Sequence, residues 1–288
     1  MKRNKTKLTG IYLGLVLLFI YLPIILVVIY SFNESKTTAM WKGFSLKWYR
    51  ELFQDTAILE ALQNSLVLGV LSCLAAAVVG TLGAVGLTKV RHRSKGVVEY
   101  VSTLPIMIPE IILGMVFLAF FSVLHLPFGM VTLVIAHTAF CIPYILMMVK
   151  ARMAGMDPAL EEAAMDLGAS PMRTFLDITL PLIMPAVMSG CLLAFAMSLD
   201  DVVITIFVNG PKLNTLPIKV YTQTKFGVTP KINALCTIML AVTLAVLAAG
   251  QLLRFLFSLA GRRGVRRGNA GSHLYSGQVT ITEDGKSG

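Results

Sequence analysis

Charged side chains are scarce in this sequence. Only 14% of the 288 residues are Asp, Glu, Lys or Arg, whereas 56% are hydrophobic, and the mean hydropathy is +0.76. Soluble domains carry about 25% charged residues. The shortage of charge argues against a soluble protein and predicts an integral membrane protein in contact with lipid.

Acidic residues are the scarcer charged kind, with 15 of them against 25 Lys and Arg, which gives a net charge of +10. A basic protein can bind nucleic acid, but here the basic residues cluster beside apolar runs and no nucleic-acid-binding motif accompanies them. The charge therefore indicates orientation in a membrane, and we expect no nucleic-acid partner.

Metal-binding and nucleotide-binding motifs are missing as well. The four cysteines lie in different apolar runs without metal-ligand or disulfide spacing, so they are expected to be buried hydrophobic residues. Residues 285–287 resemble the end of a P-loop, but Thr280 stands where that motif requires glycine. No nucleophile and base pair supports a membrane enzyme. The sequence thus predicts no metal, no cofactor and no catalytic activity.

What the sequence does contain is a series of long apolar runs. They predict an all-α multi-pass membrane protein with about six transmembrane helices. A short external turn at residues 126–129 divides one uncharged stretch that is too long for a single helix. The expected spans are residues 8–32, 61–88, 100–124, 129–149, 181–208 and 232–254.

Basic clusters at the two ends of the chain predict its topology. One cluster precedes the first span and another follows the last, and basic residues stay on the cytoplasmic side, so both termini are expected there. The first apolar run is too long for a signal peptide and lacks a cleavage site. We expect one membrane domain over residues 1–257 and a Gly- and Ser-rich, disordered cytoplasmic tail over residues 258–288.

Aromatic residues gather between the first two spans, in residues 34–60. Side chains of this kind rest at a membrane interface, so residues 46–53 are expected to form a short helix on the outer surface. A simple loop is the alternative interpretation.

A polar stretch at residues 157–181 interrupts the apolar second half of the chain. Asp157 and Pro158 are typical of a helix start, and Gly168 is typical of a helix end. Ser170 and Pro171 then begin a second helix. The stretch is therefore expected to be two short helices joined by a tight bend.

The same stretch contains a spaced pattern of small, acidic and apolar residues. Its members are Glu162, Ala163, Ala164, Gly168, Ile178, Leu180 and Pro181. This pattern resembles the EAA loop of type I permease subunits from binding-protein-dependent ABC importers. In that family the cytoplasmic loop docks into a groove on the ATPase subunit and transmits its closure to the membrane. Two alanines would let a partner approach the helix closely, and the acids would meet basic groups. The alternative interpretation is that this is an ordinary amphipathic loop, which would also form a helix, a glycine turn and a second helix.

Three acids lie inside the expected spans, namely Glu110, Asp200 and Asp201. Ionisable groups in a membrane cost several kcal/mol, so each is a functional candidate. At 1.5 Å per residue, Glu110 would lie about 16 Å from Glu99, near the midplane, and the two aspartates near the outer end of the fifth span. Together they would form an acidic path suited to a flexible cation that carries several amines.

Neighbouring helical residues point about 100° apart, so the two aspartates cannot face one point. One is expected to line the path and the other to pair with a lysine of the outer loop, such as Lys212 or Lys219. Hydrogen bonding of all three acids within the bundle is the alternative. His137 stands alone in the fourth span and is expected to be a hydrogen-bonded core residue, with a relay role as the alternative.

The sequence around the aspartates narrows the resemblance. Residues 198–204, Ser-Leu-Asp-Asp-Val-Val-Ile, together with residues 105–110 and 215–217, are similar to the second permease of spermidine/putrescine importers. The likeness extends to about Phe257. It implies a type I permease fold in the bacterial inner membrane, forming half of the translocation pathway.

The resemblance also implies partners. These are cytoplasmic ATP-binding subunits, a homologous partner permease in a heterodimer, an external solute-binding protein, a polyamine substrate and membrane lipid. Relatives in the wider family import ferric iron, opines or phosphonates, which are alternative substrates. An ion-coupled secondary transporter is the competing class, although it would have no use for an EAA loop.

Overall fold

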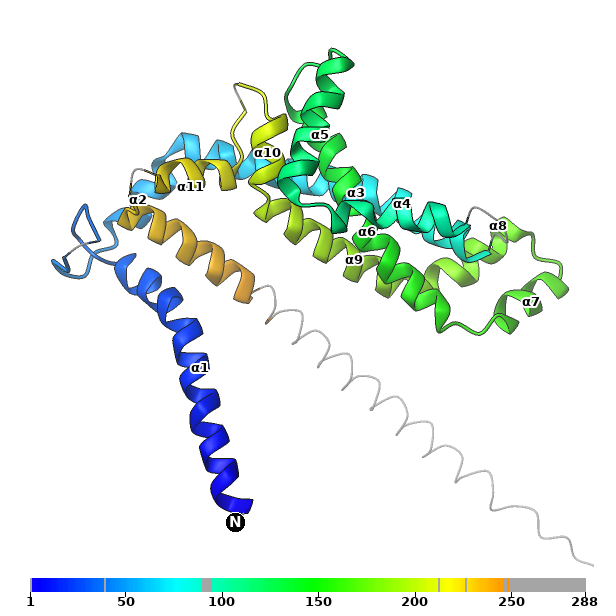
Figure 1. Cartoon of the computed structure of the whole chain (residues 1–288), viewed down its shortest axis with the longest axis horizontal. Coiled ribbons are helices and arrows are strands. Elements are labelled where there is room, and N and C mark those ends of the chain that lie inside the picture. The colour runs from blue at the N-terminus through cyan, green and yellow to red at the C-terminus, as the bar shows by residue number, and fades with distance from the viewer. Residues whose placement is uncertain are drawn as a thin grey trace, which may run out of the picture. The chain divides into compact units, whose positions relative to one another are not determined.

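The computed structural model describes residues 2–38, 40–89, 95–211, 213–225, 227–245 and 248. Within these ranges every regular element is a helix, apart from one isolated bridge between Asn33 and Phe44 (Figure 1). The chain divides into two compact units, Met1–Trp48 with Asn233–Gly288, and Tyr49–Ile232. The expectation of an all-α protein is confirmed for the described part of the chain.

The first unit contains helix α1 (Lys2–Tyr30) and a folded loop after it. The side chain of Asn33 organises this loop, because it accepts a hydrogen bond from the backbone N–H of Lys42 and donates one to the carbonyl of Met40. The indole of Trp48 donates to the carbonyl of Asn33 at 2.7 Å. Helix α2 (Lys47–Gln54) follows, which confirms the expected short helix near residues 46–53.

The second unit is built on α3 (Thr56–Lys89), α6 (Met130–Ala154) and α9 (Leu180–Asp200), which share one apolar core. Small residues let these helices approach closely. A Cβ added at Gly80 or at Gly190 would lie within 3.1 Å of Ile145 atoms. Such close contact is how helices associate in lipid, where burial of apolar surface gives no advantage over exposure to lipid.

The segment expected to span the membrane over residues 100–124 is not one straight helix. Helices α4 (Lys95–Met107) and α5 (Glu110–Val123) are bent by 109° at residues 108–109. Pro109 causes the break, because it has no N–H to bond the preceding turn and its ring disfavours the helical conformation of the residue before it. Glu110 is therefore the first residue of a new helix.

The span expected over residues 181–208 is also interrupted. Helix α9 ends at Asp200, Asp201 is extended, and the short helix α10 (Val203–Val208) begins two residues later. Helix α10 packs against α5, where Gly114 contacts Ile204 and Phe207. Two broken segments thus lie against each other in the membrane-spanning part.

The polar loop at residues 157–181 contains α7 (Ala159–Asp166), α8 (Pro171–Thr174) and a π-helix, η1 (Phe175–Thr179), that runs directly into α9. Helix α11 (Leu216–Thr224) and a helix over Pro230–Ala245 follow α10. Across the described ranges, four helices are long and apolar enough to cross a membrane, or five with the bent pair, and Pro230–Ala245 is a shorter apolar helix. The end of the expected sixth span and the tail at residues 258–288 lie outside the described residues.

Candidate functional site

The polar loop at residues 157–181 has the local structure that its sequence predicts. The backbone N–H of Ala159 donates to the carboxylate of Asp157 at 3.0 Å, which begins α7. Gly168 ends that helix with φ +89°, a conformation that glycine adopts without strain. Ser170 caps α8 by accepting from the N–H of Arg173. The helix-glycine-helix expectation is confirmed.

Glu161 ties this loop to the membrane-spanning helices. Its carboxylate lies 3.0 Å from the ammonium group of Lys89 on α3 and accepts a hydrogen bond from the hydroxyl of Thr179 in η1. Burial favours the neutral acid, but the hydrogen bonds from Thr179 and Lys89 outweigh burial and lower the pKa of Glu161. These two contacts form what is called the joint at Glu161 below. The sequence does not predict the joint, because Lys89 and Thr179 are far from Glu161 in the sequence and only tertiary packing brings them together.

The predicted coupling residues divide between two surfaces. Glu162 and Ala163 are exposed on α7, whereas Ala164 is turned inward, with 9% of its surface exposed. Ile178 and Leu180 are half-buried and Pro181 is exposed. One side of the loop therefore faces solvent, and the other faces a cleft inside the loop.

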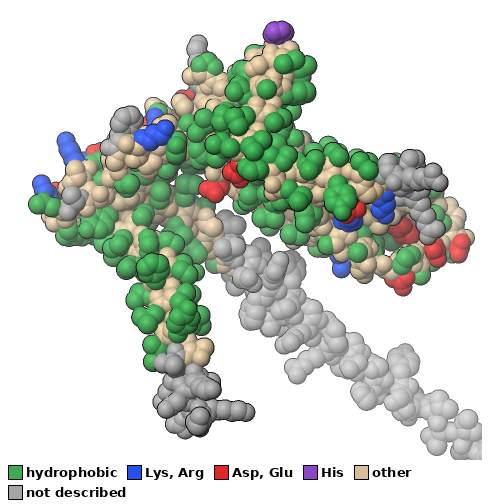
Figure 2. Space-filling model, in the orientation of Figure 1, with side chains coloured by type: hydrophobic (Ala, Val, Ile, Leu, Met, Phe, Trp, Pro, Cys, Tyr) green, Lys and Arg blue, Asp and Glu red, His purple; other side chains and the backbone are tan. Residues whose placement is uncertain are grey.

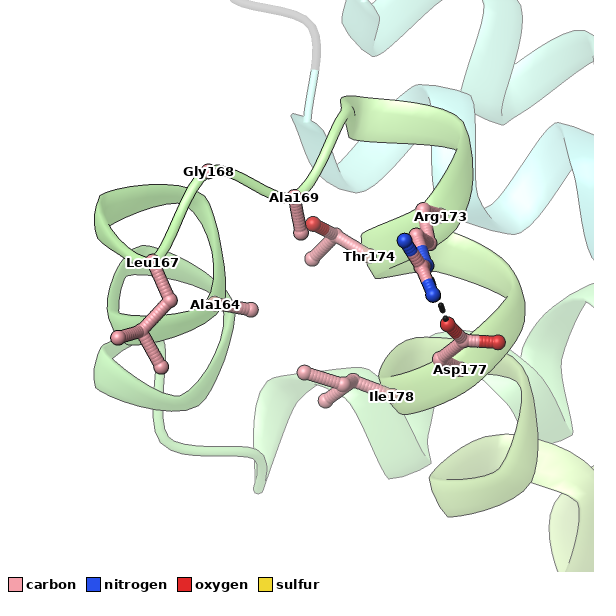
Figure 3. A pocket seen from close by; sticks show the side chains of 8 residues that line it. All are labelled: Ala164, Leu167, Gly168, Ala169, Arg173, Thr174, Asp177 and Ile178. Atoms are coloured by element: carbon pink, nitrogen blue, oxygen red, sulfur yellow. Dashed lines mark hydrogen bonds and ion pairs between the residues drawn. The ribbon is translucent and has the colours of Figure 1, made fainter.

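This cleft separates α7 from α8 and η1 and has a volume of about 290 Å³. Figure 3 shows the side chains of Ala164, Thr174 and Ile178 pointing towards the gap, with the Arg173 and Asp177 ion pair beside it. The lining residues are Ala164, Leu167, Gly168, Ala169, Arg173, Thr174, Asp177 and Ile178. The walls combine apolar residues with Thr174 and the charged pair Arg173 and Asp177.

The second group of candidate residues lies at the breaks in the membrane-spanning helices. Asp201 is buried and caps α10, because its carboxylate accepts from the N–H groups of Ile204 and Thr205 and from the Thr205 hydroxyl, at 2.7 to 3.2 Å. These hydrogen bonds stand in place of an ion pair between Asp201 and Lys219, and Lys212 lies outside the described residues. Asp201 is therefore hydrogen-bonded within the bundle.

His137 completes this buried cluster. It is fully buried on α6, with Nδ1 2.8 Å from the hydroxyl of Ser198 and Nε2 3.1 Å from that of Thr205. Its Nε2 also lies 3.4 Å from the Asp201 carboxylate. His137 is thus the hydrogen-bonded core residue that the sequence predicts, and it joins α6 to both sides of the α9 and α10 break.

Asp200 and Glu110 behave differently from Asp201. Asp200 is the last residue of α9 and Glu110 is the first residue of α5, and both are exposed. Figure 2 shows a small group of acidic side chains set among hydrophobic ones on the visible face of the protein. These two acids are available to a ligand, whereas Asp201 is occupied by its own neighbours.

Apolar helices long enough to span a membrane, interrupted at acidic residues and joined to a polar helix-glycine-helix loop, define a multi-pass membrane transport subunit. Residues 71–264 match the family described as binding-protein-dependent transport system inner membrane component, and the chain belongs to this family. It is a bacterial inner membrane protein and a non-catalytic subunit of a binding-protein-dependent transport system.

Curated relatives match most of the chain. The putrescine transport system permease protein PotI of Escherichia coli K12 is 41% identical over 255 residues, which cover 86% of this chain and 90% of PotI. The spermidine/putrescine transport system permease protein PotC of the same organism is 39% identical over 246 residues, which cover 85% and 93% of the two chains.

Solved structures share the fold at low sequence identity. A chain of a bacterial ABC transporter that imports the acidic polysaccharide alginate has a TM-score of 0.71 and 16% identity, covering 86% of this chain and 96% of that one. A chain of the MetNI methionine ABC transporter has a TM-score of 0.56 and 19% identity, covering 73% and 95%. The expected type I ABC importer permease fold is confirmed.

Proposed function

We propose that this chain is a permease subunit of an ATP-driven importer for polyamines such as spermidine and putrescine, and that it forms half of the translocation pathway. The observation that carries the proposal is the pair of exposed acids at helix breaks, Asp200 and Glu110, in a chain about 40% identical to polyamine permeases. A polyamine is a flexible cation with several amines, and carboxylates in a low-dielectric path attract it.

Asp200 and Glu110 contact the polyamine as it passes, and Asp201 shapes the path by capping α10. The division of roles follows from burial. A carboxylate that already accepts several internal hydrogen bonds has little capacity left for an amine, whereas an exposed one in the membrane-spanning part needs a cationic partner.

The cytoplasmic loop at residues 157–181 docks onto the ATPase subunit through α7, where Glu162, Ala163 and Ala164 lie before the turn at Gly168. Movement of α7 reaches the pathway by two routes. Glu161 links it to α3 through Lys89, and η1 continues without interruption into α9. ATPase closure therefore moves the helix that ends at Asp200.

A complete importer needs two such loops, because the ATPase works as a dimer. The second loop belongs to a homologous partner permease in a heterodimer, and a solute-binding protein delivers the polyamine to the outer loops. Basic clusters support a topology with both termini in the cytoplasm.

Uptake of labelled spermidine and putrescine tests the proposal in cells that express the whole importer. Asp200→Asn should abolish uptake, and Glu60→Gln, which changes an exposed acid on α3, is the matched control. Assembly of the complex is measured in parallel. Wild-type cells without importer-dependent polyamine uptake would refute the substrate, and normal uptake by Asp200→Asn would refute the pathway.

A further inference from the structure

Two of the four cysteines lie against each other in the second unit, although they are 118 residues apart in the sequence. Cys73 is on α3 and Cys191 is on α9, and both are free thiols. The Cys73 thiol donates to the backbone carbonyl of Cys191 at 3.3 Å. The side chains of the two cysteines are also within hydrogen-bonding reach of each other. The spacing of the cysteines gives no sign of this pair, because only the packing of α3 against α9 creates it.

The packing of α3 against α9 holds the two cysteines in register. Residues four apart lie on the same face of a helix, so Gly69 lies one turn before Cys73 on α3. Phe195 likewise lies one turn after Cys191 on α9. A Cβ added at Gly69 would lie 2.9 Å from the ring of Phe195, so the antiparallel helices are in contact there as well. Such an approach suits a disulfide, which requires Cα atoms about 4.4–6.8 Å apart.

The two thiols differ in their access to small molecules. Cys191 is half-buried, whereas Cys73 is only 8% exposed. A third core cysteine, Cys141 on α6, is fully buried and donates to the carbonyl of Ala194 at 3.4 Å. A small oxidant therefore reaches Cys191 first, and Cys73 lies behind it as the second thiol. Buried thiols react slowly, so the pair responds to sustained oxidant and not to a brief exposure.

We propose that Cys73 and Cys191 form an oxidation site, in which a hydroperoxide converts the two thiols into a disulfide. The Cys191 sulfur takes one oxygen atom from the hydroperoxide and becomes a sulfenic acid, while the rest of the hydroperoxide leaves as an alcohol or, from hydrogen peroxide, as water. The Cys73 sulfur then attacks the Cys191 sulfur. The S–S bond forms, and the sulfenic oxygen leaves as water with the proton of the Cys73 thiol. The thiols lose two electrons to the hydroperoxide, and an added dithiol reverses the change by exchange.

The disulfide fastens α9 to α3 in the core. Helix α9 continues from η1 and ends at Asp200, whereas α3 is linked to the polar loop through Lys89. Because the loop acts on the two helices through different contacts, its movement shifts one helix against the other. A covalent bond between them opposes this shift and halts transport until the bond is reduced. This consequence rests on the proposed function, in which ATPase closure moves α9, whereas the oxidation site itself does not.

The first test maps disulfides in the whole importer after treatment with hydrogen peroxide in lipid nanodiscs. Mass spectrometry should find the Cys73 and Cys191 peptides joined, and dithiothreitol should separate them. Cys236→Ser removes a different half-buried thiol and should form the bond like wild type, whereas Cys191→Ala should leave Cys73 reduced. Free thiols at both positions after treatment, or a disulfide that involves Cys141, would refute the oxidation site.

The second test measures polyamine uptake by the same importer in proteoliposomes before and after peroxide. Wild-type uptake should fall about tenfold or more and return on reduction, because a conformational step is blocked. Cys73→Ser retains a hydroxyl donor for the carbonyl of Cys191 and should keep its uptake in peroxide. If the disulfide forms and uptake is unchanged, the arrest of transport is refuted. If untreated wild type takes up no polyamine, the substrate of the proposed function is refuted, and disulfide mapping still decides the oxidation site.

Discussion

Asp201 and His137 meet at the break between α9 and α10, with Nε2 of the imidazole 3.4 Å from a carboxylate oxygen and neither side chain more than 2% exposed. The same carboxylate caps α10, so one acid holds both the imidazole and the start of a helix. This relationship gives two adjacent aspartates different roles. Asp201 fixes the break, and Asp200 is left exposed beside it.

Replacement of His137 tests the importance of this cluster for folding. His137→Asn shortens the side chain, so that it can no longer reach the hydroxyls of both Ser198 and Thr205. Leaving buried polar groups unpaired costs about 1–3 kcal/mol, and we expect a loss of stability in that range. Thermal unfolding of the detergent-solubilised permease measures it.

His125 offers a matched control for that substitution. It is exposed and has φ 52°, a conformation that asparagine tolerates, so His125→Asn should leave the unfolding temperature unchanged. Equal effects of the two variants would contradict a structural role for the buried cluster.

Charge removal at the two aspartates should separate transport from stability. Asp200→Asn removes an exposed carboxylate, so uptake should fall while the unfolding temperature stays within error. Asp201→Asn replaces one accepting oxygen with an N–H donor that faces the donors of Thr205, which should cost about 1–3 kcal/mol. Paired measurements of uptake and unfolding distinguish the variants. A reversed pattern would show that Asp201 is the acid in contact with substrate.

The sequence predicts the class of fold and the helices of the polar loop well, because both depend on local signals. Apolar length defines a span, and Gly168 and Ser170 mark where helices end and begin. The helix breaks beside Glu110 and Asp201 are harder to predict from the sequence. Pro109 is a local signal for a helix break, whereas the break at Asp201 contains no proline or glycine. The feature that marks this break is the cap of α10, in which the Asp201 carboxylate accepts a hydrogen bond from Thr205, four residues later. The cap becomes recognisable only when the structure shows His137 beside the same carboxylate.

The joint at Glu161 should depend more on Thr179 than on Lys89. The Thr179 hydroxyl is fully buried and donates to a charged group, so Thr179→Val should cost about 1.5–3 kcal/mol. The Lys89 side chain is 39% exposed, and Lys89→Met should cost less than about 1 kcal/mol because solvent screens the pair. Chemical unfolding of both variants checks this order, and a larger loss for Lys89→Met would contradict it.

The joint should also weaken in acid. The pKa of Glu161 is lowered in the folded chain, so the unfolded state binds the proton more readily. The stabilisation is therefore complete above the ordinary pKa of a glutamate, about 4.3, and is lost as the pH falls through the lower folded value. Glu161→Gln should remove this part of the pH dependence. If wild type and variant lose stability in parallel between pH 6 and pH 3, the link between Glu161 and folding is wrong.

The contact between α5 and α10 should not tolerate an added methyl group. A Cβ at Gly114 would lie 2.6 Å from a ring carbon of Phe207 and 3.4 Å from the backbone of Ile204, so Gly114→Ala forces the Phe207 ring, or α10 with it, to shift. Overpacking of this kind costs about 1–3 kcal/mol. Gly86→Ala on α3 meets no atom within 4 Å and should leave stability unchanged or raise it, because alanine favours the helix. Since α10 begins beside Asp201, Gly114→Ala should also slow uptake, whereas Gly86→Ala should not. Normal stability and uptake in Gly114→Ala would mean that α10 does not hold the position on which the acidic pathway depends.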